Sequence, residues 1–268
     1  MGMLRAAAVA GRFYPAEPDR LEAVVRSLLA TDREPERALA VVVPHAGYVY
    51  SGAIAGETFA RVHVPPVAVV LGPNHTGLGA RAAVVCRGQF AIPGAALAIQ
   101  EEYACALRDA AGLEEDALAH AREHSLEVQL PLLRGRNPDV SIVPICLSWH
   151  DAHACVRMGE ALARALSAHR DRVLLVASTD MNHYLPDDVT RERDARALEP
   201  LLRLDAEGLH ATVEREGISM CGVIPTTVVL AAARALGARR AELVRYGTSG
   251  DAFGERDRVV GYAGVVIQ

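Results

Sequence analysis

Short apolar runs without polar alternation recur along the chain, and most of them are followed by a helical pattern. We expect strands at 39–43, 67–72, 82–86, 140–147, 172–178, 241–247 and 258–267. A strand that is apolar on both faces has to be covered on both faces, and parallel strands joined by helices meet this requirement. The sequence therefore predicts an α/β fold with a central mixed, largely parallel sheet that helices cover on both faces.

Helical patterns occupy most of the intervals between these strands. In residues 18–31, Leu21, Val25 and Leu28 recur at the spacing of one helix face. Since no repeat or long linker divides the chain, we expect a single domain over residues 1–268. Pro131 should kink or interrupt the helix expected at 123–134. The other expected helices are at 52–61, 101–111, 152–168, 188–203, 205–215 and 225–236.

The composition excludes several classes of function. With a net charge of −5 over 268 residues, the chain has no electrostatic footprint for nucleic acid. It contains no lysine, which excludes Schiff-base catalysis and the lysine of a phosphate-binding P-loop. No apolar run reaches the roughly 18–20 residues that span a membrane, and the N-terminal stretch is too weakly apolar for a signal peptide. We therefore expect a cytoplasmic protein with no nucleic-acid or membrane partner.

The cysteines, at 86, 105, 146, 155 and 221, are odd in number and include no CxxC pair. Neither a disulfide framework nor a four-cysteine zinc site is indicated, and most of them resemble small buried hydrophobic residues. Cys221 differs, because it lies between Met220 and Gly222 just before a helix expected to begin at Pro225. The positive end of that helix would favour a thiolate, whereas burial would leave an unreactive thiol, and the sequence leaves both open.

Three of the expected strands end in a polar turn that contains a histidine. VVVPHAGY carries His45, VVLGPNHTG carries Asn74 and His75, and VLLVASTDMNHY carries Asp180 and His183. In α/β sheets the carboxyl ends of parallel strands form the edge where ligands bind. These side chains are therefore expected to meet at one edge of the sheet and to form a binding site there.

Two histidines at neighbouring strand ends suit a metal ion, because neutral imidazole is a common ligand for transition metals. A third ligand would complete a facial site, and a set of two histidines and one carboxylate requires an acidic residue. The acidic candidates are Asp180, Glu123, Glu127 and Asp251, and Cys221 competes with all of them.

The stretch EHSLEVQLP at 123–131 is dense in polar residues. On the expected helix Glu123 and Glu127 share a face, while the zinc-protease pattern HExxH is absent. The segment is consistent with a solvated helix face, and we retain His124 and Glu127 as secondary site candidates. The remaining histidines, at 63, 120, 150, 153, 169 and 210, lie in stretches with the character of protein surface.

Several motifs together resemble the Memo family, whose prokaryotic members are called AmmeMemoRadiSam system protein B. The matching motifs follow the family's order and extend over nearly the whole chain, which makes the set specific although each is short. They are AVAGRFYP (8–15), PHAGYVYSG (44–52), LGPNH (71–75), EHSLEVQLP (123–131), STDMNHY (178–184), MCG (220–222), YGTSGD (246–251) and VVGYAGVV (259–266). The resemblance implies a fold similar to that of class III extradiol dioxygenases, which are non-haem iron enzymes.

The resemblance also implies roles for individual residues. The two histidines and one cysteine of the family's metal site match His45, His75 and Cys221. The acid/base histidine of the related dioxygenases matches His183, with Asp180 close by. A thiolate in place of a carboxylate softens the site, so the expected cofactor is a single iron or copper ion, with zinc also compatible. The family name further suggests a functional link to AMMECR-type and radical SAM proteins.

Three functions are compatible with these residues. The leading hypothesis is a metal-dependent oxidoreductase or redox protein with a dioxygenase-like His/His/Cys site and an unknown substrate. The second is a non-enzymatic protein that binds a small molecule or peptide in the same pocket. The third is a metal-independent hydrolase with Cys221 as nucleophile, His183 as base and Asp180 as orienting group. Further residues expected at the pocket are Tyr48, Asn74, Tyr184 and Asp251.

Overall fold

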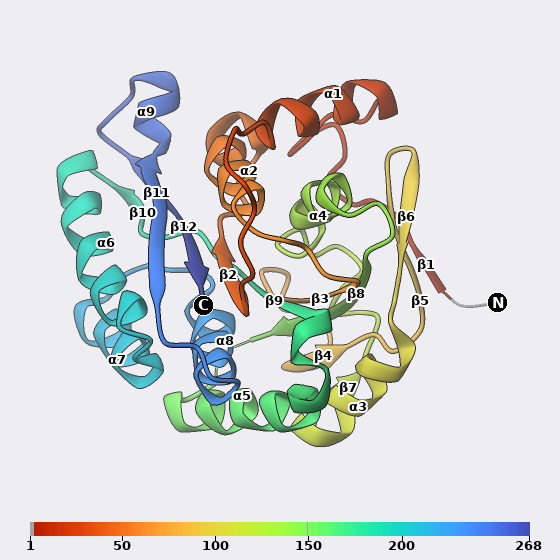
Figure 1. Ribbon diagram of the computed structural model, residues 1–268. Coiled ribbons are helices and arrows are strands. Elements are labelled where there is room, and N and C mark those ends of the chain that lie inside the picture. Colours follow the sequence, from red (N-terminus) through yellow and green to blue (C-terminus); the bar gives the residue numbers. More distant parts are fainter. Residues whose placement is uncertain (1–2, 149) are drawn as a thin grey trace.

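Parallel strands form the centre of the main sheet. The computed structural model describes residues 3–148 and 150–268 (Figure 1). The parallel strands lie side by side in the order β2 (Ala40–Val43), β9 (Val173–Ser178), β3 (Val67–Pro73) and β8 (Ser141–Leu147). Every residue of β2, β3 and β9 is buried, which explains why these segments lack polar alternation.

Antiparallel strands extend the sheet on both sides. Next to β2 lies β12 (Val259–Ile267), which also pairs with β10 (His183–Leu185) and β11 (Ala241–Thr248). The short helix α9 (Ser249–Phe253) follows β11. Next to β8 lies β4 (Ala82–Val84), which is followed by β7 (Glu114–Glu115). The sheet is therefore mixed with a parallel centre.

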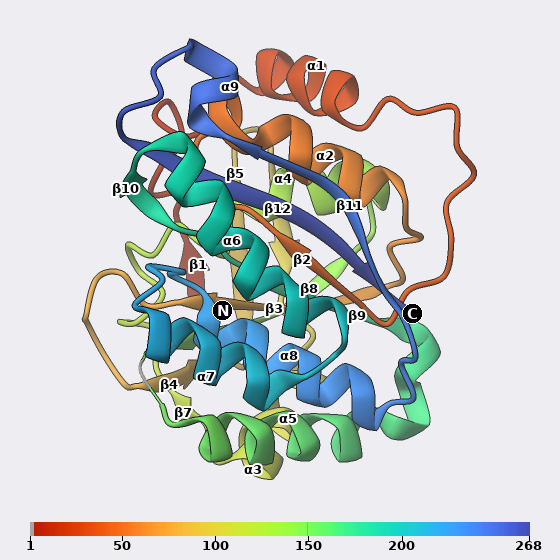
Figure 2. The ribbon, with the colours of Figure 1, turned by 90° about the vertical axis from the view of Figure 1, so that its left-hand side faces the viewer.

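Helices cover both faces of this sheet (Figure 1; Figure 2). On one face α8 (Val223–Ala235) packs against β2, β3 and β9, while α5 (Ala152–Leu166) and α7 (Ala206–Glu216) pack on α8. On the other face α2 (Ala53–Ala60) packs against β2 and β12, with α4 (Leu130–Arg136) and α1 (Pro18–Leu28) beside it. The remaining long helices are α3 (Glu101–Ala111), against β8, and α6 (Asp187–Leu202), against β10, β11 and β12. The predicted fold class is confirmed.

Proline, aspartate and glycine residues at the helix ends explain where several helices begin or end. α1 has Pro18 in its first turn, where the missing backbone N–H leaves no hydrogen bond unmade. α5 is capped by Asp151, whose side chain accepts a hydrogen bond from the backbone N–H of Ala154. α3 ends at Gly112, whose φ of 65° lies in the left-handed region that favours glycine. In the part of the chain that the structure describes, no helix is long and apolar enough to cross a membrane.

The structure contains a second, smaller sheet that the sequence pattern does not predict. β1 (Met3–Arg5) is parallel to β5 (Gly88–Ile92), which forms a hairpin with β6 (Ala95–Ala98). These strands are short and contain several alanines, so they lack the β-branched runs that indicate a strand. Pairing between segments that are far apart in the sequence stabilises them instead.

Residues 123–134 do not form the single helix that we expected. A short 3-10 helix, η2 (Glu127–Gln129), leads into α4, which begins at Leu130 with Pro131 in its first turn. Proline fits the first turn of a helix better than the interior, so Pro131 starts this helix and does not kink it. Glu123 and Glu127 consequently do not share a solvated face, and both are buried.

Two histidines expected at the surface are buried instead. His120 packs against the Phe90 ring and its Nδ1 lies 3.0 Å from the Asp116 carbonyl oxygen. His210, on α7, is also buried, and its Nε2 lies 3.2 Å from the carbonyl oxygen of His150. In both cases segments from elsewhere in the chain cover a residue whose sequence neighbours are polar.

Candidate metal centre

The carboxyl ends of β2, β3 and β9 lie at the same edge of the sheet. Val43, the last residue of β2, pairs with Ser178, the last residue of β9, and β3 runs parallel to β9 on its other side. His45, His75 and Asp180 each lie two residues beyond the end of one of these strands. The structure therefore brings the strand-end residues together at this edge.

A hydrogen bond at Nδ1 holds the His45 ring and leaves the lone pair of its other nitrogen, Nε2, available for a metal ion. Its Nδ1 lies 3.0 Å from the Ser178 hydroxyl oxygen, which donates its own proton to the Ser125 carbonyl (2.6 Å). The Ser178 oxygen must then accept from Nδ1–H, which leaves the lone pair of the neutral ring on Nε2. Burial, followed by His124 and His75, holds the pKa of His45 well below its ordinary value, so the ring is neutral.

His75 is oriented in the same way by Glu123, which is buried. Its Nδ1 lies 2.9 Å from one carboxylate oxygen of Glu123, and its backbone N–H donates to the other (2.6 Å). Burial alone would raise the pKa of Glu123, but hydrogen bonds from His75 and from the Ser125 backbone lower it to about 2. A carboxylate only accepts, so Nδ1 of His75 carries the proton and Nε2 is free. A carboxylate behind a histidine is a common support for metal ligands.

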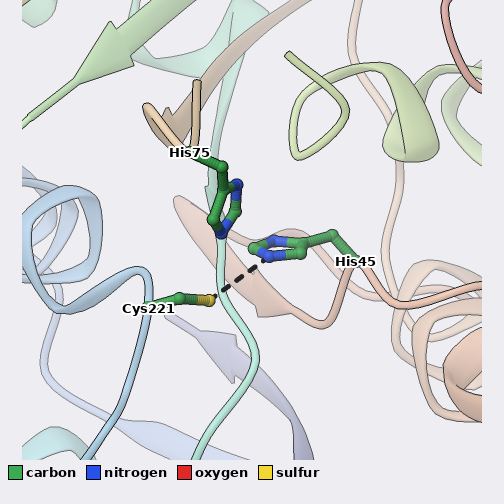
Figure 3. A group of neighbouring side chains, drawn as sticks. All are labelled: His45, His75 and Cys221. Carbon is green, nitrogen blue, oxygen red and sulfur yellow. Dashed lines mark hydrogen bonds between the residues drawn. The ribbon is translucent and has the colours of Figure 1, made fainter. Parts of the chain in front are cut away.

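Cys221 reaches this edge from the turn before α8. The backbone N–H of Gly222 donates to the Thr179 hydroxyl (2.9 Å), which anchors the turn to the end of β9. A Cβ at position 222 would lie 2.5 Å from the Ser178 carbonyl oxygen, so only glycine allows this approach. The sulfur of Cys221 lies 3.3 Å from Nε2 of His45 (Figure 3).

The donor set fits a single metal ion. The sulfur of Cys221 and a ring nitrogen from each of His45 and His75 lie within 4.8 Å of one another (Figure 3). Atoms that bind one zinc-sized ion at about 2.0–2.3 Å are about 3–4 Å apart, so small side-chain shifts would close the set. His75, Glu123 and His124 form a second group within the same distance. In that group both carboxylate oxygens of Glu123 already accept hydrogen bonds, which favours the cysteine-containing set.

The thiol of Cys221 is not activated by its position near a helix. Burial, followed by the Asp180 carboxyl, raises its pKa above the ordinary value. α8 begins at Val223, earlier than the expected Pro225, and its N-terminus does not offset burial. Of the two interpretations left open by the sequence, the structure favours the unreactive thiol. A bound cation would supply the positive charge that a coordinating thiolate needs.

His183 and Asp180 lie at the same edge but are not paired as expected. Nδ1 of His183 lies 2.8 Å from the Ser219 carbonyl oxygen, while Asp180 accepts a hydrogen bond from the backbone N–H of His45 (2.8 Å). Ser219 therefore orients the His183 ring, a role that we had assigned to Asp180. Burial raises the pKa of Asp180.

His124 contributes a third imidazole to the centre. Its ring stacks on His75, with centroids 4.6 Å apart, and lies 5.4 Å from the His45 ring. Phe13 covers it from another side, at 4.7 Å. Burial, in spite of the nearby Glu123, lowers the pKa of His124 and favours the neutral ring.

A pocket of about 730 Å³ opens beside these residues and is lined by His45, His75, His124, Asp180 and His183. Its lining also includes several aromatic residues, although the chain has only 4 Phe, 7 Tyr and 1 Trp. A polar centre surrounded by aromatic side chains is typical of a site for an organic ligand. The aromatic residues are Phe13, Tyr50, Tyr184, Phe253 and Tyr262.

Glu127, a secondary candidate, is fully buried and lies outside the pocket lining. Its carboxylate pairs with Arg5 and accepts hydrogen bonds from the backbone N–H groups of Ala8 (2.8 Å) and Val9 (3.0 Å) and from the Tyr14 hydroxyl (2.5 Å). All of these partners belong to the N-terminal segment. Glu127 therefore fastens that segment to the start of α4.

Three other candidates are bound to residues away from the pocket and also lie outside its lining. The Tyr48 hydroxyl donates to the Val128 carbonyl (2.8 Å). The side-chain oxygen of Asn74 accepts hydrogen bonds from the backbone of the turn that follows it. Asp251, in the first turn of α9, accepts a hydrogen bond from the backbone N–H of the capping residue Thr248 (2.9 Å) and pairs with Arg191 (2.8 Å). Tyr184, by contrast, lines the pocket and is exposed.

Together these features define an α/β protein with a candidate His/His/Cys metal centre at the carboxyl edge of its parallel strands. The chain belongs to the Memo family: the family model described as Memo-like protein matches residues 5–266. A Memo family protein of Methanopyrus kandleri is 39% identical over 99% of both chains. One of Methanosarcina barkeri is 38% identical over 99% of this chain and 100% of that one. The resemblance drawn from the motifs is confirmed.

A solved structure shares the fold. An uncharacterized protein from Escherichia coli K12 superposes with a TM-score of 0.54 over 85% of this chain and 99% of that one. The sequence identity between the two is 15%. At this level the likeness concerns the arrangement of strands and helices alone.

Proposed function

We propose that this protein binds a single transition-metal ion through His45, His75 and Cys221 and acts as a metal-dependent oxidoreductase on a small ligand in the adjacent pocket. The orientation of the donors carries the proposal. In both histidines a protein acceptor holds Nδ1–H, which leaves Nε2 free to coordinate. Imidazole together with thiolate favours iron or copper, and zinc is also compatible.

The surrounding side chains would have separate roles. A bound ion would supply Lewis-acid and electron-transfer chemistry. His183 would exchange a proton with the ligand through Nε2, because its Nδ1 is committed to the Ser219 carbonyl. Asp180 would hold the backbone of His45 through their 2.8 Å hydrogen bond.

Anomalous X-ray scattering tests the proposal directly. Crystals of protein purified without added metal should show one ion between His45, His75 and Cys221, and data at the iron, copper and zinc edges should identify it. The same crystals can then be soaked in a reductant and a chelator. Loss of the anomalous signal would establish that the site exchanges its ion with the solution. An anomalous peak at another position, with none between these residues, would contradict the proposal.

Substitution of Glu123 by glutamine should weaken metal binding by roughly 10–100-fold, because the amide cannot hold His75 as a carboxylate does. Competition with a chromophoric chelator measures the affinity. Glu102→Gln is the matched control, since Glu102 is exposed on α3 and should bind metal as the wild type does. Wild-type affinity in Glu123→Gln would show that this carboxylate does not support the site.

The pocket also supports a second candidate function, a non-enzymatic protein that binds a small molecule or peptide. The observation in its favour is the set of aromatic side chains around the pocket, which provides binding surface without requiring an ion. Calorimetric titration of candidate ligands distinguishes the two. Binding that is unchanged in metal-free His45→Ala and Cys221→Ser variants would favour the binding protein.

The hydrolase receives less support from the geometry. The imidazole beside Cys221 is His45, and His183 bonds Ser219 instead of Asp180. Within the described residues the three groups therefore do not form the hydrogen-bonded chain that activates a nucleophile.

We expect iodoacetamide to alkylate Cys221 of metal-free protein more slowly than Cys105, which lies on α3 away from the pocket. The reason is that burial and Asp180 raise the pKa of the Cys221 thiol. Peptide mass spectrometry after timed labelling at neutral pH measures both rates in one sample. Faster alkylation of Cys221 would instead favour a nucleophilic thiol and the hydrolase.

A further inference from the structure

A hydrogen-bond network connects a buried carboxyl on α6 to His183. The side chain of Asp194 is fully buried. Its Oδ1 accepts a hydrogen bond from the backbone N–H of Asn182 (2.8 Å), and its Oδ2 accepts one from the Tyr246 hydroxyl (2.7 Å). Both direct partners are uncharged donors, so the carboxyl is not buried as half of an ion pair. Its position is better explained by the loop that it anchors.

Asn182 extends the network to Ser219. The side-chain oxygen of Asn182 accepts hydrogen bonds from the N–H (3.3 Å) and the hydroxyl (3.2 Å) of Ser219. Ser219 in turn binds two nitrogens of His183: its Oγ accepts from the backbone N–H (2.7 Å), and its carbonyl lies 2.8 Å from Nδ1. A carbonyl only accepts, so Nδ1 carries a proton and the neutral ring has its lone pair on Nε2.

The absence of a side chain at Gly261 leaves the space that the Asp194 carboxyl occupies. A Cβ at Gly261, on β12, would lie 1.8 Å from Oδ2 of Asp194. The same glycine fixes the loop, because Met181 N–H donates to its carbonyl and its N–H donates to the Asn182 carbonyl (2.9 Å each). Asp194 and the backbone before His183 are therefore held against the same point of β12.

We propose that Asp194 is a positioning residue that, through Asn182 and Ser219, holds the neutral His183 ring in its Nδ1–H tautomer with Nε2 available to the pocket. The inference rests on the proposed role of His183. Its test, however, observes the ring in metal-free protein, so its outcome is independent of whether His45, His75 and Cys221 bind an ion.

The network should respond to pH near neutrality. Burial raises the pKa of Asp194 to about 7, although the Tyr246 hydroxyl and the Asn182 amide favour the ionised form. The ionisable groups that act on it are Arg191, from α6 itself, and Tyr246, from β11. Towards β12 it faces Gly261, and towards the loop it faces the Asn182 amide. Above neutral pH the carboxylate should therefore be the stronger acceptor for this amide.

Nitrogen-15 NMR of the histidine rings tests the positioning role. In wild-type protein the neutral His183 ring should be a single Nδ1–H tautomer. Asp194→Ala should convert it to the mixture of tautomers found in a solvent-exposed histidine. Tyr246→Phe is the control, because it removes a partner of Asp194 without touching Asn182, and it should keep the single tautomer. A folded Asp194→Ala protein that keeps the single tautomer would overturn the proposal.

A second measurement tests the coupling between Asp194 and Asn182 without the Asp194→Ala variant, so it can be made even if that variant does not fold. The backbone amide proton of Asn182 should shift with a midpoint near the Asp194 pKa of about 7. This titration should be lost in the isosteric Asp194→Asn and kept in Asp188→Asn, which changes an exposed aspartate of the same helix. An Asn182 amide that titrates identically in wild type and Asp194→Asn, or not at all in wild type, would overturn the coupling.

Discussion

Replacing Cys221 with serine, or either His45 or His75 with alanine, is expected to lower metal affinity by more than about 100-fold. Each change removes one of three donors, whereas residues that only support a ligand typically contribute about 10–100-fold. Serine keeps the size of the side chain but offers no soft thiolate, so the cysteine variant should lose iron, copper and zinc alike. Metal content after dialysis against a chelator, measured by mass spectrometry of the elements, gives the result.

Two further variants make this experiment specific. Cys105→Ser removes a thiol on α3 and should keep the wild-type metal content, which controls for the loss of a cysteine as such. His124→Ala separates the two possible donor groups, because His124 belongs only to the group with Glu123. Full metal content in the His45 and Cys221 variants, with loss in the His124 variant, would place the ion in that other group.

Alanine at Glu127 is expected to destabilise the protein by about 3–5 kcal/mol, the usual effect of breaking a buried ion pair from one side. Arg5, itself buried, would be left without its carboxylate, and the Tyr14 hydroxyl and the backbone N–H groups of Ala8 and Val9 would lose their acceptor. Urea-induced unfolding, followed by circular dichroism, measures the change in the free energy of unfolding.

The control for this prediction is Glu22→Ala, which removes an exposed partner of Arg26 and should change stability by less than about 1 kcal/mol. Replacing both members of the buried pair, as Arg5→Met with Glu127→Leu, should cost less than Glu127→Ala alone, because no unpaired charge remains. A loss below about 1 kcal/mol in Glu127→Ala would show that the N-terminal segment is held by other contacts.

The role of Glu127 also clarifies two of the family motifs. AVAGRFYP contains Ala8, Val9 and Tyr14, and EHSLEVQLP contains Glu127, which accepts hydrogen bonds from all three. The two stretches therefore stabilise each other, although the polar residues of the second suggested a ligand site. The neighbouring Glu123 supports His75 instead, so two acidic residues four positions apart have different functions.

The arrangement of the site could be predicted in part. Apolar runs at β2, β3 and β9 implied parallel neighbours, and parallel strands place their carboxyl ends together, so the convergence of His45, His75 and His183 followed from the sequence. The support of each ring could not be predicted. Glu123 lies 48 residues from His75, Ser178 lies 133 residues from His45, and Ser219 lies 36 residues from His183.

The sequence by itself determined the fold class, the family and the identity of the strand-end histidines, because these depend on periodicity and motifs carried by neighbouring residues. Only the tertiary structure decided which ring nitrogen each histidine leaves free, that burial leaves the Cys221 thiol unactivated, and that Glu127 faces the N-terminal segment. The physical reason is that hydrogen-bond partners and burial are set by packing between distant segments. A glutamate four residues from another has the same local pattern whether it supports a metal ligand or closes a buried ion pair.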